Sequence, residues 1–409
     1  MKNFLLLLMS AFVLMSCGDE IPQIERKHHQ GRSVFAYLVS NNSGPSLSDD
    51  LKKNIVGMYN GMVSCTDTCK LLVFYRPYDS ESDFHGPTIL EFISDSHGKV
   101  NGKQALTGAE ATLSNIIAQA IKYRVRGTDG NSANLNSTDP AVMESVLRKM
   151  KSLAPSDSYG LVVGSHGNNW LEGNSVQSKS FGDDAGNSIS IPHLANVLQK
   201  VFETDELDYL LFDACLMGSI EVCYELRNVL KYCIASPQEI PAAGFPYDDI
   251  MQNLYDKDID YQEICDSYIA HCKKEDSWGT VAAYDMAEIE DVQVWFKNEI
   301  QNKDLDFSPY IYSIQQYGRS SFKNLIFDVV DAVKVMNGGE VDDDLEKAMD
   351  KFVIAKACIP DFTKYGGGLY IEESRYSGLG MYIPNASNKD SWNSYYKTLS
   401  WSQAVGWDK

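Results

Sequence analysis

The chain has 409 residues, of which 44% are hydrophobic and 11% are aromatic. This composition is typical of a globular protein with a sizeable core, and it excludes a disordered chain. The formal net charge of −20 argues against a nucleic-acid partner, because neutralising phosphates requires Lys and Arg, and we interpret it as a contribution to solubility.

The first residues have the pattern of a targeting segment. Lys2 provides a positive start, and the apolar run Phe4–Met15 is too short to span a bilayer. The run ends in LMSC and resembles a bacterial lipobox, which predicts a signal peptide over residues 1–16 and lipidation of Cys17. Residues 17–30 are expected to form a polar tether. No other segment could cross a membrane, so we expect a lipid-anchored protein of the cell envelope, periplasmic or surface-exposed.

Strand-like and helix-like segments then alternate, which predicts an α/β fold with a mainly parallel central sheet flanked by helices. Continuous apolar runs predict strands covered on both faces: Val34–Val39, Leu71–Tyr75, Thr88–Ile93, Tyr159–Val163, Leu207–Phe212, Tyr232–Ala235, Thr280–Tyr284, Gly368–Ile371 and Gly380–Ile383. Capping signals and helical spacing predict helices at Gly108–Lys122, Pro140–Lys151, Ile191–Phe202, Gly218–Leu230 and Tyr261–Lys273. Residues 300–409 are expected to form a helical C-terminal subdomain whose final strands complete the sheet.

Two predicted strands end in chemically reactive side chains. Tyr159–Val163 leads to His166, and Leu207–Phe212 leads to Cys215. Sites in open parallel sheets form outside the carboxyl ends of the strands, so we expect the two side chains to face each other. A thiolate is a nucleophile, and an imidazole can take and return protons near neutral pH. The amides of Gly167 and Cys215, the latter at a helix start, are candidate donors to an oxyanion.

The segments SHGNNW (165–170) and DACLMGSIEVCYEL (213–226) resemble the two signatures of the clostripain family of cysteine peptidases. The resemblance implies a caspase-like fold over residues 31–299, with His166 as general acid/base and Cys215 as nucleophile. The separation of 215 − 166 = 49 residues is close to the spacing of caspase-type His and Cys. Peptides or proteins would be the substrates, and calcium is the one candidate cofactor, because some relatives need it.

Members of this family characteristically cleave after Arg or Lys. Asp213 matches the family's aspartate before the cysteine, and we expect it to bind a basic P1 side chain by charge attraction. An alternative is that Asp213 caps the following helix. Ser236 and Asp248 are further candidate substrate-binding residues. The loop at residues 240–244 departs from the pattern, since alanines stand where many relatives carry an acid.

Two other features follow from the resemblance. Asn169 stands where the family's histidine motif usually carries glycine before tryptophan, and we expect it to alter the pocket wall. Some relatives mature by cutting the loop between His and Cys; Lys179 is the basic residue of the polar stretch at 176–190, which predicts cleavage there and a monomer or a cleaved two-chain form. Asp183 and Asp184 are candidate calcium ligands.

The main alternative is a non-catalytic surface lipoprotein that uses the same fold as a binding module, with His166 structural and Cys215 an inert thiol. His193 could compete as the base, but its place after Pro192 predicts a surface helix residue. His271 lies between Cys265 and Cys272, and a metal cluster is disfavoured because the neighbouring Cys272 points about 100° away on a helix. A serine hydrolase is disfavoured, because the chain contains no Gly-x-Ser-x-Gly elbow.

Overall fold

The computed structural model describes residues 28–41, 46–78, 84, 86–126, 135–171, 180–203, 206–303, 307–318, 325–360, 371–385 and 388–407. Cys17, Lys179 and nearly all of the strand expected at Gly368–Ile371 lie outside these residues. Within the described segments, no helix combines the length and the apolar character that crossing a membrane requires.

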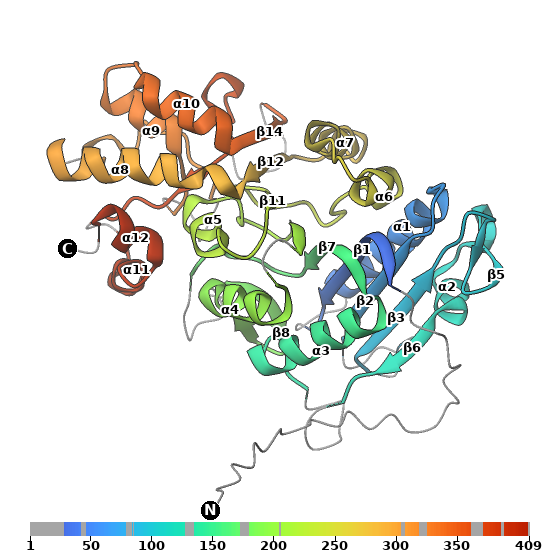
Figure 1. Ribbon diagram of the computed structural model, residues 1–409. Helices are drawn as coiled ribbons and strands as arrows, with labels where there is room; N and C mark the ends of the chain where they lie inside the picture. Colours follow the sequence, from blue (N-terminus) through green and yellow to red (C-terminus); the bar gives the residue numbers. More distant parts are fainter. Residues whose placement is uncertain are drawn as a thin grey trace, which may run out of the picture.

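A nine-stranded sheet forms the centre of the molecule (Figure 1). Its order is β14 (Val353–Cys358), β12 (Thr280–Asp285), β11 (Tyr232–Ala235), β10 (Leu207–Asp213), β7 (Ser156–Gly164), β1 (His29–Val39), β2 (Lys70–Arg76), β3 (Thr88–Ile93) and β6 (Ile121–Arg124). The five strands from β11 to β2 are parallel, and the two outer strands on each side run antiparallel to their neighbours. The described residues also form three small two-stranded sheets: β4 (Lys99–Val100) with β5 (Lys103–Gln104), β8 (Phe181–Asp184) with β9 (Asn187–Ile189), and β13 (Phe327–Asp328) with β15 (Gly380–Met381).

Two layers of helices explain why the central strands are mostly apolar. Every residue of β2 and of β10 is buried. One face of the sheet packs on α1 (Ser46–Ser64), α2 (Leu113–Gln119), α6 (Tyr247–Tyr255) and α7 (Tyr261–Lys274). The other face belongs to a larger core with α3 (Pro140–Leu153), α4 (Ile191–Val201), α5 (Ile220–Leu226), α8 (Ile289–Lys303), α9 (Val329–Met336), α10 (Asp343–Phe352), α11 (Asp390–Tyr396) and α12 (Ser400–Val405). The predicted α/β fold class is therefore confirmed.

The segment expected as one helix at Gly108–Lys122 is divided. A short 3₁₀ turn at Gly108–Glu110 precedes α2, whose N-terminus is capped by Thr112 through the Asn115 amide. The chain then pairs antiparallel with β3 as the edge strand β6, where the Tyr123 hydroxyl donates to Glu91 at 2.7 Å. Tertiary pairing with the sheet edge ended a helix that spacing alone would have continued.

The C-terminal region completes the sheet with a different strand from the one expected. β14 forms the outermost strand beside β12, whereas β15, within the predicted strand Gly380–Ile383, pairs with β13 in a separate sheet and bridges to Ser219 through Gly380. The sequence VIAKAC of β14 directly follows α10, so its apolar residues read as a continuation of the helix. At the other end, β1 begins at His29, inside the expected tether, where the His29 amide donates to the Pro155 carbonyl.

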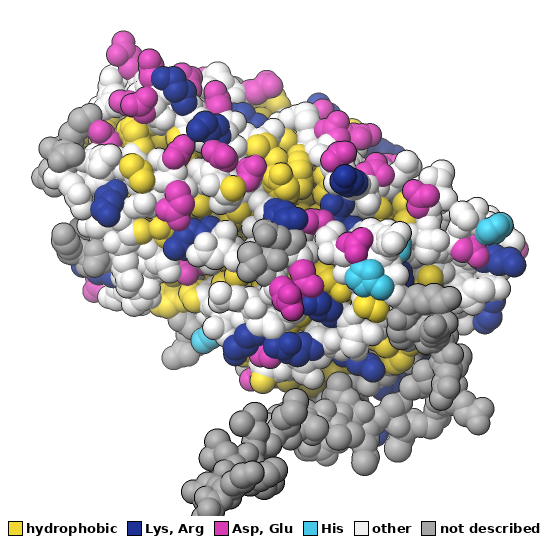
Figure 2. Space-filling view, in the orientation of Figure 1, with side chains coloured by type: hydrophobic (Ala, Val, Ile, Leu, Met, Phe, Trp, Pro, Cys, Tyr) yellow, Lys and Arg dark blue, Asp and Glu magenta, His cyan; other side chains and the backbone are white. Residues whose placement is uncertain are grey.

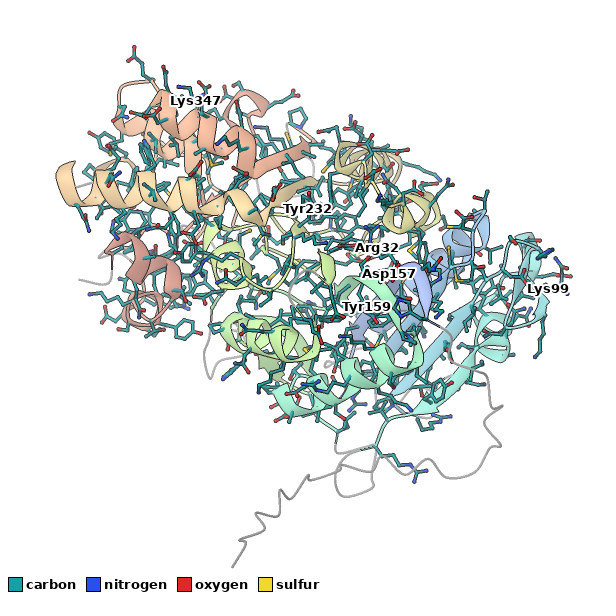
Figure 3. All side chains as sticks on the ribbon, in the orientation of Figure 1. Arg32, Lys99, Asp157, Tyr159, Tyr232 and Lys347 are labelled. Atoms are coloured by element: carbon teal, nitrogen blue, oxygen red, sulfur yellow. The ribbon has the colours of Figure 1, made fainter. Side chains whose placement is uncertain are left out.

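Charged side chains show two different uses. Figure 2 shows acidic side chains over the C-terminal helices, where exposed Asp343 and Asp344 begin α10 near the positive end of its dipole. At the opposite extreme, Arg32 near the start of β1 is buried and pairs with Asp208 at 2.8 Å, close to Asp157 and Tyr159 of β7 (Figure 3). This pair lies at the amino ends of the central strands, so the carboxyl ends remain for a site.

A second buried ion pair anchors the β8–β9 hairpin near those carboxyl ends. Asp184 accepts hydrogen bonds from Arg76 Nε at 3.1 Å, Asn41 Nδ2 at 2.7 Å and both the amide and the hydroxyl of Ser137. The Arg76 and Asp184 side chains are 3% and 2% exposed. The hairpin is therefore fixed to the ends of β1 and β2.

We expect Asp184→Ala to lower the free energy of unfolding by roughly 3–5 kcal/mol, because it leaves the Arg76 guanidinium buried without its counter-charge. Urea unfolding followed by tryptophan fluorescence would measure this loss. Asp49→Ala, which removes an exposed partner of Lys52 in α1, should leave the midpoint close to wild type. Equal shifts for the two variants would contradict the assigned role of the buried pair.

Candidate active site

The register of two neighbouring strands aligns the ends that carry His166 and Cys215. β7 and β10 pair in parallel, with Val163 opposite Phe212 and Gly164 opposite Asp213. His166 follows Gly164 by two residues, and Cys215 follows Asp213 by two residues. Both side chains therefore leave the same edge of the sheet from adjacent strands. The chain turns back here: from β1 it builds β2, β3 and β6 on one side, and β7 and β10 on the other. Such a reversal creates a crevice at the carboxyl ends.

The two strand ends are in direct contact. A Cβ built on Gly167 would lie 2.6 Å from the Cys215 carbonyl oxygen and 3.0 Å from Ala214 Cβ. Only glycine permits the backbone of the histidine loop to approach the nucleophile loop this closely. The His166 side chain is exposed and Cys215 is half-buried. The histidine loop and the cysteine loop are therefore packed together, with the histidine exposed to solvent and the cysteine partly covered.

The loop that follows β11 covers the thiol. The Ile240 amide donates to Cys215 Sγ at 3.3 Å, and the Leu216 amide donates to the Gln238 carbonyl at 2.9 Å. Cys215 itself lies in a turn, with Leu216 in the left-handed region at φ 66°. Helix α5 begins only at Ile220, so the expectation that Cys215 stands at a helix start is wrong: the turn and its Ser219 cap intervene.

Asp213 lies beneath this loop as a buried carboxylate. It is 7% exposed and accepts from Asn54 Nδ2 at 2.8 Å and from the Tyr247 hydroxyl at 2.9 Å. Burial raises the pKa of Asp213 to about 6, and the hydrogen bonds from Tyr247 and the Phe245 amide oppose that rise. The cap of α5 is Ser219, which accepts from the Val222 amide, so Asp213 does not have the alternative capping role.

The loop that departs from the family pattern lies directly on Asp213. Gly244 has φ 66°, and a Cβ there would lie 2.7 Å from Asp213 Oδ2 and 2.9 Å from Oδ1. Ala242 is exposed and Ala243 is half-buried. The 240–244 loop thus connects the thiol contact at Ile240 to the buried Asp213 carboxyl.

The other predicted substrate-binding residues are placed differently. Ser236 is fully buried, and its hydroxyl lies 2.8 Å from Thr280 Oγ1 and accepts from the Gln238 amide, which shapes the loop that leads to Ile240. Asp248 is exposed on the first turn of α6 and accepts from Asn60 of α1 at 2.9 Å. The structure brings Asp213 to the Cys215 loop, while Ser236 is committed to internal hydrogen bonds.

The expected calcium ligands have other partners. The Asp184 carboxylate accepts from Arg76, Asn41 and Ser137, so its oxygens are occupied by protein donors. Asp183 Oδ1 closes the hairpin turn through the Gly186 amide. No cluster of His, Cys, Asp and Glu that could hold a metal occurs among the residues described.

His193, the alternative candidate for the base, lies in the first turn of α4. Its Nδ1 is 2.9 Å from the Ser190 hydroxyl, and the residue is exposed, as expected for a surface helix residue.

Sequence reasoning missed the contribution of the C-terminal segment to both loops. Gly380 donates to the Gly218 carbonyl at 2.9 Å, and the Tyr382 amide donates to Glu221 Oε1 at 2.7 Å. On the other side, Trp170 packs against Tyr382 at a centroid distance of 5.1 Å and against Tyr396 at 5.5 Å. Glu221 stands among apolar residues, which indicates a buried hydrogen-bond partner. Nothing in the sequence identified Tyr382 as that partner.

The clostripain family profile matches residues 36–409. The chain belongs to the clostripain family. It is similar to clostripain from Hathewaya histolytica, with 28% identity over 130 residues, which is 29% of this chain and 25% of the clostripain. The match therefore spans a quarter of that relative's length. The family comprises cysteine peptidases, hydrolases of peptide bonds, so the predicted relationship is confirmed.

Two solved structures share the fold. One is a secreted C11 cysteine protease from Bacteroides thetaiotaomicron in complex with an irreversible peptide inhibitor, at a TM-score of 0.70 and 23% identity, covering 93% of this chain and 100% of that one. The other is an inactive zymogen C11 protease from Parabacteroides distasonis, at a TM-score of 0.71 and 23% identity, covering 93% and 99%. The fold of the clostripain-family chain is thus that of C11 proteases.

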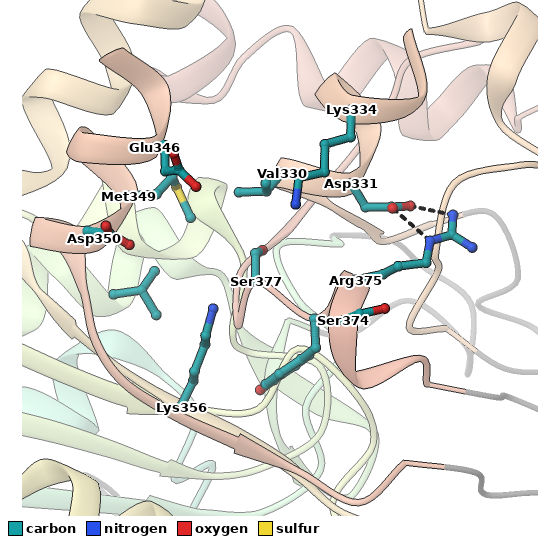
Figure 4. Close-up of a pocket in the computed structure, with 12 residues that line it drawn as sticks. Val330, Asp331, Lys334, Glu346, Met349, Asp350, Lys356, Ser374, Arg375 and Ser377 are labelled. Carbon is teal, nitrogen blue, oxygen red and sulfur yellow. Dashed lines mark hydrogen bonds and ion pairs between the residues drawn. The ribbon is translucent and has the colours of Figure 1, made fainter. Parts of the chain in front are cut away.

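A separate hollow lies in the C-terminal region among α9, α10 and β14 (Figure 4). Its walls carry Lys334 and Lys356 together with Glu346 and Asp350, and Arg375 pairs there with Asp331 at 2.6 Å. None of its lining residues comes from the segments that carry His166 or Cys215. This hollow is therefore separate from the strand ends that carry His166 and Cys215.

Glu221 gives the site a testable pH signature. Burial raises its pKa from the ordinary 4.5 to about 7. Between these values the folded chain holds a proton that the unfolded chain has lost, so this carboxyl lowers stability progressively as pH rises through the window. Glu221→Gln keeps an acceptor for Tyr382 without the charge. The free energy of unfolding of Glu221→Gln should exceed that of wild type by on the order of 2 kcal/mol at about pH 8, and by little at about pH 5.

Thermal unfolding of wild type and Glu221→Gln across this pH range would measure the difference. Asp213 titrates in both proteins, so its contribution cancels. A difference that does not change with pH would show that Glu221 is ionised in the folded chain throughout.

Proposed function

We propose that this protein is a cysteine endopeptidase that acts through a Cys215/His166 dyad. The observation that supports it most strongly is the β7–β10 register, which sends both side chains from the same sheet edge at matching positions. Family membership supports the reaction class. The exposed imidazole and half-buried thiol fit a site that receives a peptide from solvent.

The reaction would proceed in two steps. His166 takes the thiol proton, and Cys215 Sγ attacks the peptide carbonyl carbon; the C–N bond then breaks as the imidazolium returns the proton to the leaving amine. Water next attacks the thioester, giving its proton to His166, and the carboxyl product leaves with the thiolate restored. Amides of Gly167 and Cys215 are the proposed donors to the oxyanion that forms in each step.

We propose a preference for Arg or Lys at P1, with Asp213 as the recognising acid. Its burial places it in poorly solvated surroundings, where attraction to a cation is strong. The pKa of about 6 means that the carboxyl is neutral in acid and charged near neutrality. A basic side chain would therefore bind well only above about pH 6.

Lipid anchoring through Cys17 and maturation by cleavage after Lys179 are also proposed. The segment that follows Lys179 supports the second proposal. Ser180 accepts from the Asn168 amide at 2.9 Å, and Gly182 donates to the His166 carbonyl at 2.9 Å. A chain cut before Ser180 would keep its new end bound to the histidine loop, so the two pieces would remain together.

Cleavage after Lys179 predicts an internal N-terminus at Ser180 in active protein and an uncut chain for Lys179→Ala. Mass spectrometry under denaturing conditions would show both, and size-exclusion chromatography should show the cut pieces eluting as one particle. A fully active wild type that remains intact by mass would contradict this proposal.

The activity itself is tested with fluorogenic peptides ending in Arg, Lys, Asn, Asp, Ala or Leu, using the chain from residue 18 onward. We expect cleavage of the Arg and Lys peptides, and loss of at least about 1000-fold in kcat/KM for Cys215→Ala, because the nucleophile is removed. Asp213→Asn should raise KM for these peptides, and in wild type KM should rise as pH falls from about 7 to about 5.

Other outcomes select other functions. Cleavage after a neutral residue would retain the dyad and move specificity to the 240–244 loop. No cleavage of any peptide, with Cys215 alkylated no faster than the other thiols, would favour a surface binding module.

A further inference from the structure

Asn169 is a buried residue with an unusual backbone conformation, three positions after His166. Its φ is 59°, in the left-handed region, and its side chain is fully buried. Asparagine tolerates this conformation, and glycine adopts it with no side chain at all. The backbone turn therefore does not require the asparagine side chain. The buried Asn169 side-chain amide therefore needs another explanation, which its hydrogen bonds provide.

The side-chain oxygen of Asn169 joins the two loops. Asn169 Oδ1 accepts from the Ser219 hydroxyl at 2.8 Å and from the Trp170 amide at 2.8 Å. The backbone N–H of Trp170 can only donate, so the atom of the Asn169 side-chain amide that faces it must be the oxygen. Ser219 in turn follows Cys215 by four residues and also accepts from the Val222 amide as the cap of α5.

The bond thus connects the segment that carries the imidazole to the segment that carries the thiol. Other links between these segments have different properties: Ser165 N to Asp213 O is long at 3.4 Å, and Gly167 contributes packing against Cys215. Ser219 is also fully buried, so the hydrogen bond is shielded from water. In the protein interior a hydrogen bond is electrostatically stronger than in water. Its length is that of a well-formed hydrogen bond.

We propose that the Asn169–Ser219 hydrogen bond is a positioning tie that sets the placement of His166 relative to Cys215. This inference rests on the proposed peptidase function. Neither residue touches substrate, since both are fully buried; each acts through the loop it belongs to. The expectation that Asn169 shapes the pocket wall is wrong for the same reason: its side chain points inward to Ser219.

The chain offers clean variants for a test. Asn169→Gly removes the tie, keeps a residue suited to φ 59°, and leaves Ser219 to cap α5. Asn101→Gly is a matched control: Asn101 is also left-handed, at φ 50°, and its side chain bonds the Ile93 amide and the Glu91 carbonyl around β3, away from both strand ends. Ser219→Thr keeps the hydroxyl, and Ser219→Ala removes it.

Two readouts separate positioning from folding. We expect Asn169→Gly to lower kcat about 10-fold, corresponding to one lost hydrogen bond acting on the transition state, with KM within about 2-fold. The rate of Cys215 alkylation by iodoacetamide, followed by peptide mapping from about pH 5 to 9, should move toward the profile of His166→Ala. Asn101→Gly should leave both unchanged, and Ser219→Thr should recover most of the activity that Ser219→Ala loses.

The double variant Asn169→Gly/Ser219→Ala should be no slower than Ser219→Ala, because one bond cannot be lost twice. Wild-type kcat and alkylation profile in Asn169→Gly, whatever its melting temperature, would overturn the tie. If wild type cleaves no peptide, the proposed function fails, while the alkylation profiles of wild type and Asn169→Gly still decide whether the tie exists.

Discussion

The pairing of β7 with β10 is the constraint on which the site depends. Parallel strands present their carboxyl ends at one edge, and a shift of one residue would turn every side chain to the opposite face. The register that pairs Gly164 with Asp213 is fixed because both strands are buried on both faces. His166 and Cys215 therefore leave the sheet at matching positions, and the fold supplies their proximity before any loop contributes.

The loops refine what the strands establish. The Ile240 amide contacts the thiol from the β11 side. From the C-terminal side, Gly380 bonds the Gly218 carbonyl and the Tyr382 amide bonds the Glu221 carboxyl. Trp170, enclosed by tyrosines of the same C-terminal region, holds the histidine loop in the core. Residues more than 200 positions apart thus converge behind the two strand ends, so the C-terminal region is part of the fold rather than an appendage.

The sequence was informative where burial alone determines structure. The buried strands β3 and β11 match their predicted bounds, because residues covered on both faces are mostly apolar. It was uninformative where pairing depends on distant partners. The spacing predicts a helix that runs into β6, and no signal separates β14 from the helix α10 that precedes it. At the site, motifs identified His166, Cys215 and Asp213, but nothing in the sequence predicted that Asn54 of α1 would donate a hydrogen bond to Asp213.

The buried acids near the strand ends differ in whether a cation pairs with them. Asp213 and Glu221 are buried, with pKa values raised to about 6 and about 7, so both change charge close to neutral pH. Asp184 has the same degree of burial but a guanidinium partner, and serves as an anchor. Burial alone therefore does not define a functional acid. Among the described residues Asp213 has no ion-pair partner, which is the basis for proposing that it binds a charge brought by a ligand.

The most direct test of this account is a crystal structure of the chain after inactivation by a peptidyl chloromethyl ketone ending in Lys. The account predicts a thioether at Cys215, His166 beside it, and the lysine ammonium within hydrogen-bond distance of Asp213. A label on another cysteine, or a lysine side chain directed away from Asp213, would contradict the account of nucleophile or specificity, respectively.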